Sequence, residues 1–246
     1  MEVEGCMTVK VEPTPQFNGV YQVTLEDGSR RIASKNLAPG RSVYGERLIK
    51  HKDGEYRLWD PYRSKIAAAI LKGLKILPIK DGSKVLYLGA ASGTTASHVS
   101  DIVGENGHVF CVEFAPRPLK ELIDNVCRFR PNMSPILADA RLPEKYVNIV
   151  EKVNVIYCDI AQPEQAQILV NNAKIFLETN GWIMLAIKAR SVDVTKEPSE
   201  VYKREIAVLE RNGFQIHQVI HLEPYDKDHA MILAQYMPKR QPGDKN

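Results

Sequence analysis

The pattern of hydrophobic and polar positions changes its period near residue 60 and divides the chain into two regions. Before this point, short runs with strand-like character, such as Val20–Leu25 and Arg31–Ala33, flank the turn at Asp27-Gly28, and a second turn lies at Asp53-Gly54. Asp-Gly predicts a hairpin because glycine accepts the positive φ of a tight turn. We therefore predict a small antiparallel β domain over residues 1–58. Because it holds no cluster of catalytic residue types, we interpret it as a packing or docking module.

Residues 59–246 follow a different pattern, in which one helix precedes alternating strands and helices. Asp60 before Pro61 predicts the N-cap of the first helix, and apolar residues from Ile66 to Leu74 recur at helical spacing. The strands predicted after it are Lys84–Leu88, Val109–Val112, Ile136–Ala138, Val153–Cys158 and Trp182–Ile187. The helices predicted between and after them are 94–103, 116–129, 143–150, 163–178 and 198–212. Such alternation predicts an α/β domain with a parallel sheet that is covered on both faces.

The end of the chain departs from this alternation. Phe214–Leu222 and Ala230–Tyr236 both have the composition of strands, and only seven residues separate them. A parallel crossover needs about a dozen residues or more, so these two strands must pair antiparallel. An α/β sheet closed by a terminal antiparallel hairpin is unlike a standard dinucleotide-binding fold. It resembles the Rossmann-like fold of S-adenosylmethionine-dependent methyltransferases.

Composition and charge narrow the class of protein. Hydrophobic residues make up 44% of the 246 positions and charged residues 26%, which predicts a packed globular core. No apolar run approaches the roughly 20 residues of a membrane helix, and the start of the chain lacks the apolar segment of a secretion signal. Cys6, Cys111, Cys127 and Cys158 form no CxxC pair, so we expect reduced thiols and a cytoplasmic location. The net charge of +3 does not by itself indicate a nucleic-acid binder.

A glycine turn follows the first strand of the second region and predicts a nucleotide site. Gly89 and Gly93 lie in the segment LGAASGTT, between a buried strand and a helix. Open α/β sheets bind ligands at this edge, where the carboxyl ends of the strands lie. The G-x-G-x-x-G pattern of a dinucleotide site is absent, because position 91 is alanine and position 94 is threonine. The spacing therefore favours a cofactor without a phosphate to bind and weakens an NAD interpretation.

Acidic residues end the next three strands of the same sheet. Glu113 follows Gly89 by 24 positions, where a carboxylate can accept hydrogen bonds from ribose hydroxyls, and Phe114 beside it can cover an adenine. Asp139 is placed to receive the adenine amino group. Together with Asp159, these residues predict one ligand-binding edge.

Two lysines are candidates for methyl-transfer chemistry at this edge. An alcohol that attacks a methyl group must lose its proton, and nearby positive charge stabilises the developing alkoxide. Lys188 closes a strand without charges at the same edge, and Lys65 lies in the first turn of the first helix. Asp159 is placed to orient a basic lysine, and His229 opens the last strand, close to both in the predicted sheet.

Longer motifs make the chain similar to the fibrillarin family, in its short archaeal form, over nearly the whole sequence. They are WDPYRSK at 59–65, YLGAASGTTASHVSD at 87–101, VEF at 112–114, ADAR at 138–141, YCDIAQP at 157–163, and LEPY at 222–225 running into DHA at 228–230. The resemblance implies an S-adenosylmethionine-dependent 2′-O-methyltransferase that acts on rRNA and tRNA and is directed by box C/D guide RNA. It also implies a Nop-family scaffold protein and a kink-turn-binding relative of ribosomal proteins as partners, and no membrane.

The resemblance further implies which residues form the site. The implied cofactor contacts, with the turn glycines Gly89 and Gly93, are Thr94, Thr95, Glu113, Phe114, Asp139, Ala140, Asp159, Ile160, Ala161 and Gln162. The implied catalytic residues are Lys65, Asp159, Lys188 and His229, and the histidine stands where many ribose methyltransferases carry glutamate. We expect Lys188 to accept the proton and Asp159 to orient it. We expect Lys65 and His229 to give electrostatic support and to place the acceptor.

Two other functions and one basic segment stay open at this stage. A metal-dependent small-molecule O-methyltransferase is one alternative, but His217 and His221, on one face of a predicted strand, lack further ligands, so we expect no metal. A non-catalytic subunit of an RNA complex is the other, and the presence of all four candidate catalytic residues speaks against it. The basic residues of segment 63–80 are interpreted as a solvated helix face or as phosphate contacts.

Overall fold

The computed structural model describes residues 9–193 and 195–237, and Cys6 and the first residues of the predicted N-terminal domain lie outside these ranges. The strands of the first sheet are β1 (Lys10–Pro13), β2 (Val20–Thr24), β3 (Arg30–Lys35), β4 (Leu48–His51) and β5 (Gly54–Leu58). Those of the second are β6 (Lys84–Leu88), β7 (His108–Glu113), β8 (Met133–Leu137), β9 (Val153–Cys158), β10 (Leu177–Lys188), β11 (Phe214–His221) and β12 (His229–Tyr236). The α-helices are α1 (Lys65–Leu71), α2 (Thr94–Val103), α3 (Pro116–Asn125), α4 (Gln165–Phe176), α5 (Ala189–Val192) and α6 (Pro198–Arg211). None of these helices combines the length and the apolarity that crossing a bilayer requires.

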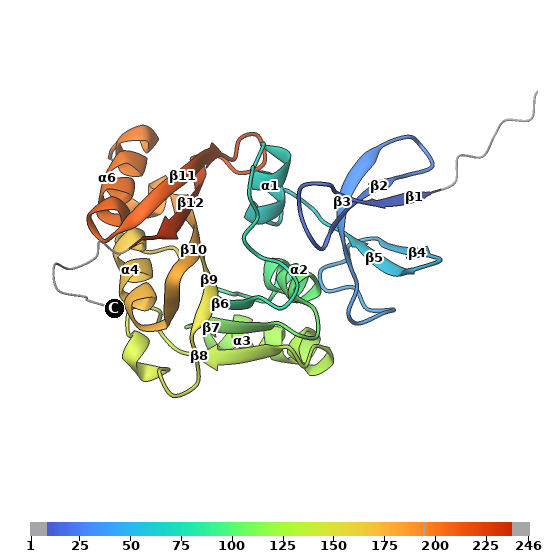
Figure 1. Ribbon diagram of the computed structural model, residues 1–246, viewed down its shortest axis with the longest axis horizontal. Helices are drawn as coiled ribbons and strands as arrows, with labels where there is room; N and C mark the ends of the chain where they lie inside the picture. Colours follow the sequence, from blue (N-terminus) through green and yellow to red (C-terminus); the bar gives the residue numbers. More distant parts are fainter. Residues whose placement is uncertain (1–8, 194, 238–246) are drawn as a thin grey trace, which may run out of the picture.

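The N-terminal sheet is antiparallel and has the strand order β1-β2-β3-β5-β4. Its first hairpin turns at Asp27, whose side chain accepts a hydrogen bond from the Ser29 amide at 2.8 Å. The sheet has a small core of its own around Val23, Ile49 and Tyr56. Figure 1 shows it beside α1 and α2, at the opposite end of the molecule from α6.

The second sheet has the strand order β11-β12-β10-β9-β6-β7-β8. Strands β10, β9, β6, β7 and β8 run parallel, and β12 pairs antiparallel with both β10 and β11. One face packs on a core that includes Ile66 of α1, Val99 of α2 and Leu122 of α3. The other face packs on Leu169 of α4 and Leu209 of α6. The predicted parallel sheet with a terminal antiparallel hairpin is confirmed.

The first helix begins later and ends earlier than predicted. Ser64, and not Asp60, is the N-cap, because its extended backbone lets Oγ accept a hydrogen bond from the Ala67 amide. Asp60 instead accepts a hydrogen bond from the Tyr62 amide at 2.9 Å and closes a turn before the helix. The helix ends at Leu71, so the lysines that follow do not share a helix face with Lys65. This corrects the interpretation of segment 63–80 as one helical face.

Two predicted helices are also shorter in the structure. Only Pro143–Lys145 forms a 3₁₀ turn within segment 143–150, and the next residue, Tyr146, is buried and hydrogen-bonded to Asn172 of α4. The helix predicted at 116–129 stops at Asn125, and a 3₁₀ turn over Cys127–Phe129 follows it.

His217 and His221 lie on opposite faces of β11, contrary to the prediction. β11 pairs with β12 through a register shift that leaves His217 at a bulge, and the extra residue reverses the alternation of side chains. The His217 ring packs on Trp182, with ring centroids 4.7 Å apart, whereas the His221 ring packs on Tyr202 at 5.5 Å. Trp182 contacts the core beneath α1, and Tyr202 belongs to the core beneath α4. The two histidines therefore do not form one metal site.

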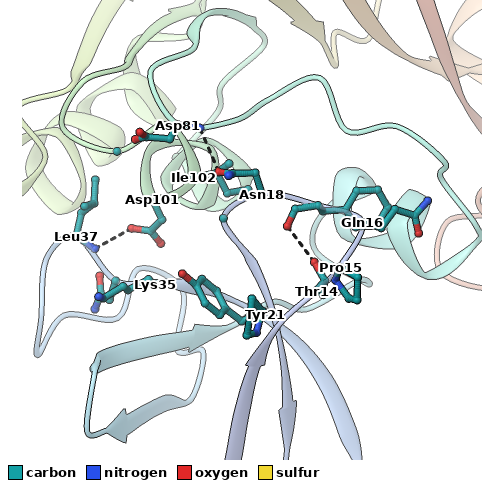
Figure 2. A pocket seen from close by; sticks show the side chains of 15 residues that line it. Thr14, Pro15, Gln16, Asn18, Tyr21, Lys35, Leu37, Asp81, Asp101 and Ile102 are labelled. Carbon is teal, nitrogen blue, oxygen red and sulfur yellow. Dashed lines mark hydrogen bonds between the residues drawn. The ribbon is translucent and has the colours of Figure 1, made fainter.

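A buried polar network joins the two sheets. Asp101 of α2 accepts hydrogen bonds from Ser34 Oγ and Arg57 Nη1, both at 2.8 Å, and from the Leu37 amide at 3.0 Å. Arg57 is buried and also pairs with Glu46 at 2.6 Å. Figure 2 shows the hollow beside this network, between loop 14–19 and α2, where Asp101 points toward the Leu37 amide. The hollow is therefore part of the packing seam, and the network fixes the N-terminal sheet against α2.

Candidate active site

A cavity of about 240 Å³ opens at the carboxyl ends of the parallel strands. Its lining residues lie at the carboxyl ends of β6, β7, β8, β9 and β10 or in the segments directly after them: Gly89, Ala91, Val112, Glu113, Phe114, Ala138, Asp139, Ala140, Arg141, Asp159, Ile160, Ala161, Gln162 and Lys188. The structure thus brings together Gly89 and the predicted site residues at 113–114, 139–140 and 159–162. Lys188 lies in the same wall.

Gly89 lets two strands approach closely at the floor of this cavity. Its φ is +83°, and a Cβ atom placed on it would lie 2.6 Å from the carbonyl oxygen of Asp159. The Asp159 amide donates a hydrogen bond to the Leu88 carbonyl at 2.9 Å. Any side chain at position 89 would push Asp159 away, so the glycine sets the position of that carboxylate.

Glu113 presents a fixed carboxylate to the cavity. Its Oε2 accepts a hydrogen bond from the Ala91 amide and its Oε1 accepts one from the Ala115 amide, both at 2.9 Å. Glu113 is buried, whereas the neighbouring Phe114 ring is 67% exposed at the rim. A fixed acceptor group therefore stands beside an open apolar ring.

Asp139 is held by Arg141, a cavity residue that the sequence analysis did not assign. Arg141 Nε donates a hydrogen bond to Asp139 Oδ2 at 2.9 Å, and its Nη2 contacts the same carboxylate. The hydrogen bonds from Arg141 lower the pKa of Asp139 below its usual value. The ADAR motif contained Arg141, but only the folded loop shows that the guanidinium turns back onto the carboxylate.

Gly93, Thr94 and Thr95 do not line the cavity. A Cβ atom on Gly93 would lie 2.6 Å from a methyl group of Leu122, so this glycine allows α2 to pack on α3. Thr94 is the first residue of α2, and Thr95 is buried and donates a hydrogen bond to Ser64 Oγ at 3.0 Å. These three residues connect the glycine turn to α1 and α3 behind the wall.

Lys65 and Lys188 meet at Asp159. Lys188 Nζ lies 2.9 Å from Asp159 Oδ1, and Lys65 Nζ lies 3.2 Å from Asp159 Oδ2. The first residue of α1, the loop after β9 and the end of β10 supply these three side chains. Each side chain is at most 20% exposed, so solvent screens the contacts only in part.

Asp226 extends this contact from Lys65 to His229. Its Oδ2 lies 3.4 Å from Lys65 Nζ, and its Oδ1 lies 2.9 Å from His229 Nδ1. His229 pairs directly with Lys188 in the register of β12 and β10. We call the resulting series Lys188, Asp159, Lys65, Asp226 and His229 the ion-pair chain. The sequence analysis missed Asp226, although it stands between the quoted motifs LEPY and DHA.

The contacts of the ion-pair chain shift the pKa values of Lys65 and Asp226. Burial alone lowers the pKa of Lys65, but the charges of Asp159 and Asp226 outweigh it and raise that pKa above 10.5. Burial raises the pKa of Asp226, but the hydrogen bond with His229 and the charge of Lys65 bring it below its usual value. Both groups are therefore ionised at neutral pH.

His229 is fixed in one tautomer. Its Nδ1 lies 2.6 Å from the Lys227 carbonyl oxygen and 2.9 Å from the Asp226 carboxylate, and both of these oxygens are acceptors. Nδ1 must therefore carry a proton, and in the neutral form of the ring the lone pair lies on Nε2. The ring is 20% exposed.

Comparison with known proteins gives the family. The fibrillarin family model matches residues 11–238. The fibrillarin-like rRNA/tRNA 2′-O-methyltransferase of Aeropyrum pernix is 58% identical over 226 residues, which cover 92% of this chain and 97% of that protein. The structure of Aeropyrum pernix fibrillarin in complex with natively bound S-adenosylmethionine has a TM-score of 0.87 and covers 92% of this chain and 99% of its own. The fibrillarin in a fibrillarin/Nop5p complex is 43% identical, with a TM-score of 0.77 over 89% of this chain and 98% of its own.

The fold itself is more widely shared. An S-adenosylmethionine-dependent methyltransferase of Aquifex aeolicus is 16% identical, with a TM-score of 0.52 over 73% of this chain and 90% of its own. The fold is therefore that of this methyltransferase class, as predicted. The family match is narrower, because it spans both sheets and includes every residue of the cavity and of the ion-pair chain. On these grounds the chain belongs to the fibrillarin family.

Proposed function

We propose that this chain transfers the methyl group of S-adenosylmethionine to the 2′-hydroxyl of ribose in rRNA and tRNA, as the catalytic subunit of a box C/D guide RNA–protein complex. One observation carries the proposal: two lysines from distant parts of the chain converge on one carboxylate at the edge of the cavity. The name of the Aeropyrum pernix relative supports the substrate class, and the cofactor bound to the fibrillarin of that organism supports the methyl donor.

The cavity residues fit S-adenosylmethionine. Asp159 Oδ1 is buried and receives no aligned hydrogen bond from the described residues, although Lys188 Nζ lies 2.9 Å away. This oxygen therefore has acceptor capacity for a positively charged group of a ligand. In this proposal Glu113 accepts hydrogen bonds from the ribose hydroxyls, and Phe114 packs on the adenine ring. Asp139 accepts a hydrogen bond from the adenine amino group when Arg141 releases part of its contact with that carboxylate. When bound, the cofactor supplies an electrophilic methyl group and a neutral leaving group.

We propose no direct contact with the cofactor for Gly93, Thr94 and Thr95. They lie behind the cavity wall, where they hold the glycine turn against α1 and α3. We propose that they shape the cofactor site through the backbone of this turn.

Lys65 and Lys188 are proposed to stabilise the attacking oxygen. Methyl transfer to a hydroxyl is an in-line displacement, and negative charge develops on the acceptor as it loses its proton. The two ammonium groups that meet at Asp159 place their positive charge at this point, although the carboxylates of Asp159 and Asp226 balance it over the ion-pair chain as a whole. Because Asp159 fixes both lysines, this charge is in place before the acceptor arrives.

The ion pairs change the role expected for Lys188. An ammonium group has no lone pair, and Lys188 Nζ lies 2.9 Å from Asp159 Oδ1 as one member of an ion pair. His229 has a lone pair on Nε2, because Asp226 and the Lys227 carbonyl hold the proton on Nδ1. We therefore assign acceptance of the hydroxyl proton to His229 and charge stabilisation to Lys188.

The proposed assembly includes protein partners. The fibrillarin/Nop5p complex supports a Nop-family scaffold. The guide RNA and the kink-turn-binding protein complete the proposal, and the net charge of only +3 suits a subunit that gains most of its RNA affinity from such partners. A cytoplasmic location belongs to the same proposal.

The test is a reconstituted methylation assay. The chain is mixed with guide RNA, a complementary target, the scaffold and the kink-turn-binding protein, and the methyl group of S-adenosylmethionine is labelled. We expect label on the 2′-oxygen of one ribose, and only in the complete mixture. Label on a base, or full activity from the isolated chain on naked RNA, would contradict the proposal.

A Lys188→Ala variant tests the catalytic assignment in the same assay. We expect its rate to fall on the order of 100-fold, which is typical for loss of one group that stabilises a developing oxyanion. Lys203→Ala, an exposed change on α6, is the matched control and is expected to keep the parent rate. A normal rate for Lys188→Ala would remove Lys188 from the mechanism.

A further inference from the structure

A second hollow adjoins the ion-pair chain on the side of the N-terminal sheet. It has a volume of about 600 Å³ and lies between β3, the segment around Arg47 and the residues that precede α1. Four arginines and two tyrosines carry its chemistry, and we call it the arginine groove: Arg30, Arg31, Arg47, Arg63, Tyr62 and Tyr225. Figure 1 shows the N-terminal sheet facing α1 across this region.

The arginines of the groove outnumber its acidic residues. All four are exposed, and none of them forms an ion pair with a carboxylate in the described ranges. Two acidic residues also line the groove, but Glu46 is buried in its pair with Arg57 at 2.6 Å. Asp60 uses its carboxylate on the Tyr62 amide. The groove therefore presents to an anionic ligand a concave surface whose guanidinium groups have no carboxylate at ion-pair distance within the described ranges.

The groove is continuous with the proposed catalytic residues. Arg63 lies two positions before Lys65, and its Nη1 donates a hydrogen bond to the Tyr44 carbonyl oxygen at 3.1 Å, which fixes its direction. Tyr225 immediately precedes Asp226 of the ion-pair chain. The rings of Tyr62 and Tyr225 meet edge to face with centroids 5.2 Å apart, and Tyr62 is 69% exposed. A ligand held at Lys65 thus extends past two aromatic rings onto the arginines.

We propose that the arginine groove binds the sugar–phosphate backbone of the acceptor RNA strand on one side of the methylated ribose. The proposal rests on the proposed function, because it takes the ion-pair chain as the place of the acceptor ribose. Planar guanidinium groups match phosphate oxygens in a bidentate manner, and the exposed tyrosine rings can pack on ribose. Phosphate and sugar contacts position a strand and carry no direct sequence information. The groove would therefore hold every target alike, whatever sequence the guide selects.

The first test removes three charges from the complete complex. The variant carries Arg30→Gln, Arg31→Gln and Arg47→Gln, and the control carries Lys174→Gln, Lys203→Gln and Arg211→Gln, three exposed changes on α4 and α6 (Figure 1). For the groove variant we expect kcat/KM for target RNA to fall at least about tenfold, equally for two unrelated guide–target pairs. The slope of log kcat/KM against log salt should become shallower by about 2, since each lost phosphate contact removes roughly 0.7 from a single-strand slope. The control should match the parent, and the affinity for S-adenosylmethionine should not change in either protein.

The second test locates the contacts on the RNA. Target strands carry a neutral methylphosphonate at single positions next to the methylated nucleotide. We expect neutral linkages on one side to slow the parent at least several-fold and to slow the groove variant no further. Tyr62→Ala should lower kcat/KM about tenfold, and Tyr62→Phe, which keeps the ring, should restore it.

The outcomes separate this proposal from the proposed function. Absence of ribose methylation by the parent complex would remove the proposed function itself. Normal methylation by both the parent and the groove variant would overturn only the groove proposal. The groove proposal would also be overturned if the variant lost the scaffold protein on co-purification, because the groove would then be a protein interface.

Discussion

At the scale of single residues, Asp226 connects Lys65 to His229, the last member of the ion-pair chain. It contacts Lys65 at 3.4 Å and His229 at 2.9 Å, and it is the only one of the five members that the sequence analysis did not name. Its carboxylate has two effects, because it opposes the charge of Lys65 and holds the proton of His229 on Nδ1. It does not line the cofactor cavity, so its effects on catalysis and on cofactor binding are separable.

Asp226→Asn is expected to lower the methylation rate about tenfold, because a charge-assisted hydrogen bond becomes a neutral one. The affinity for S-adenosylmethionine, measured by calorimetry, should not change. The pKa of Asp226 lies below its usual value, so the carboxylate of the parent is ionised throughout the pH range 5–8, and the two rates are compared at one pH within this range. Asp228→Asn is the matched control, because this neighbouring carboxylate pairs with Arg190. Equal rates for Asp226→Asn and the parent would show that Asp226 does not position His229.

At the scale of elements, the turn between β6 and α2 sets the geometry of the site. Gly89→Ala places a Cβ atom 2.6 Å from the carbonyl oxygen of Asp159, in addition to the strain of a positive φ. Gly73→Ala is the matched control, since Gly73 also has a positive φ but nothing lies within 4 Å of its Cβ position. We expect urea unfolding to show a loss of about 1 kcal/mol for Gly73→Ala from strain alone, without a change in cofactor affinity. Gly89→Ala should lose more stability and bind S-adenosylmethionine at least about tenfold more weakly; an unchanged affinity would contradict the role of Gly89.

Particular elements show how far the sequence predicts this fold. The antiparallel pairing of β11 and β12 follows from the length of chain between them, which excludes a crossover, and alternation alone gives the parallel strands. The bulge at His217 is not predictable in this way, because it depends on the register that β11 adopts against β12. The N-cap of α1 is not predictable in this way either, because both Asp60 and Ser64 are suitable cap residues. In the structure Ser64 caps the helix, and Asp60 closes the turn before it.

Some residues of the site are predictable from the sequence, and others depend on the folded loops. Gly89, Glu113, Asp139 and Asp159 are predictable as a group because strand ends in a parallel sheet meet at one edge. Asp226 and Arg141 are not, because their partners are fixed by the loops that carry them. Gly93 resembles a ligand-binding glycine in the sequence, yet it packs against α3, and only the position of that helix shows this.

At the scale of the whole molecule, the two sheets are held together through a buried histidine. His98 of α2 stacks on Trp59, with ring centroids 4.7 Å apart, and its ring nitrogens contact Ser34 Oγ at 2.7 Å and Tyr44 OH at 2.8 Å. Ser34 lies in β3, Tyr44 lies in the segment before β4, and Trp59 directly follows β5. The attachment of the N-terminal sheet therefore depends on an imidazole that is buried between charged neighbours.

This attachment predicts a dependence of stability on pH. Burial lowers the pKa of His98 well below 6.5, and the charges of Arg57 and Arg130 lower it further. Below pH 6.5 the unfolded chain takes up a proton at His98 that the folded chain does not, so acid favours unfolding. The free energy of unfolding should fall by about 1.4 kcal/mol per pH unit from this group, until the folded-state pKa is reached. His98→Gln lacks the imidazole that attaches the N-terminal sheet, so it should be less stable than the parent at pH 8. Because glutamine does not titrate, this difference should shrink as the pH falls from 6.5 to 5. Urea unfolding at several pH values measures both curves, and parallel curves would mean that the neutral state of His98 does not contribute to holding the two sheets together.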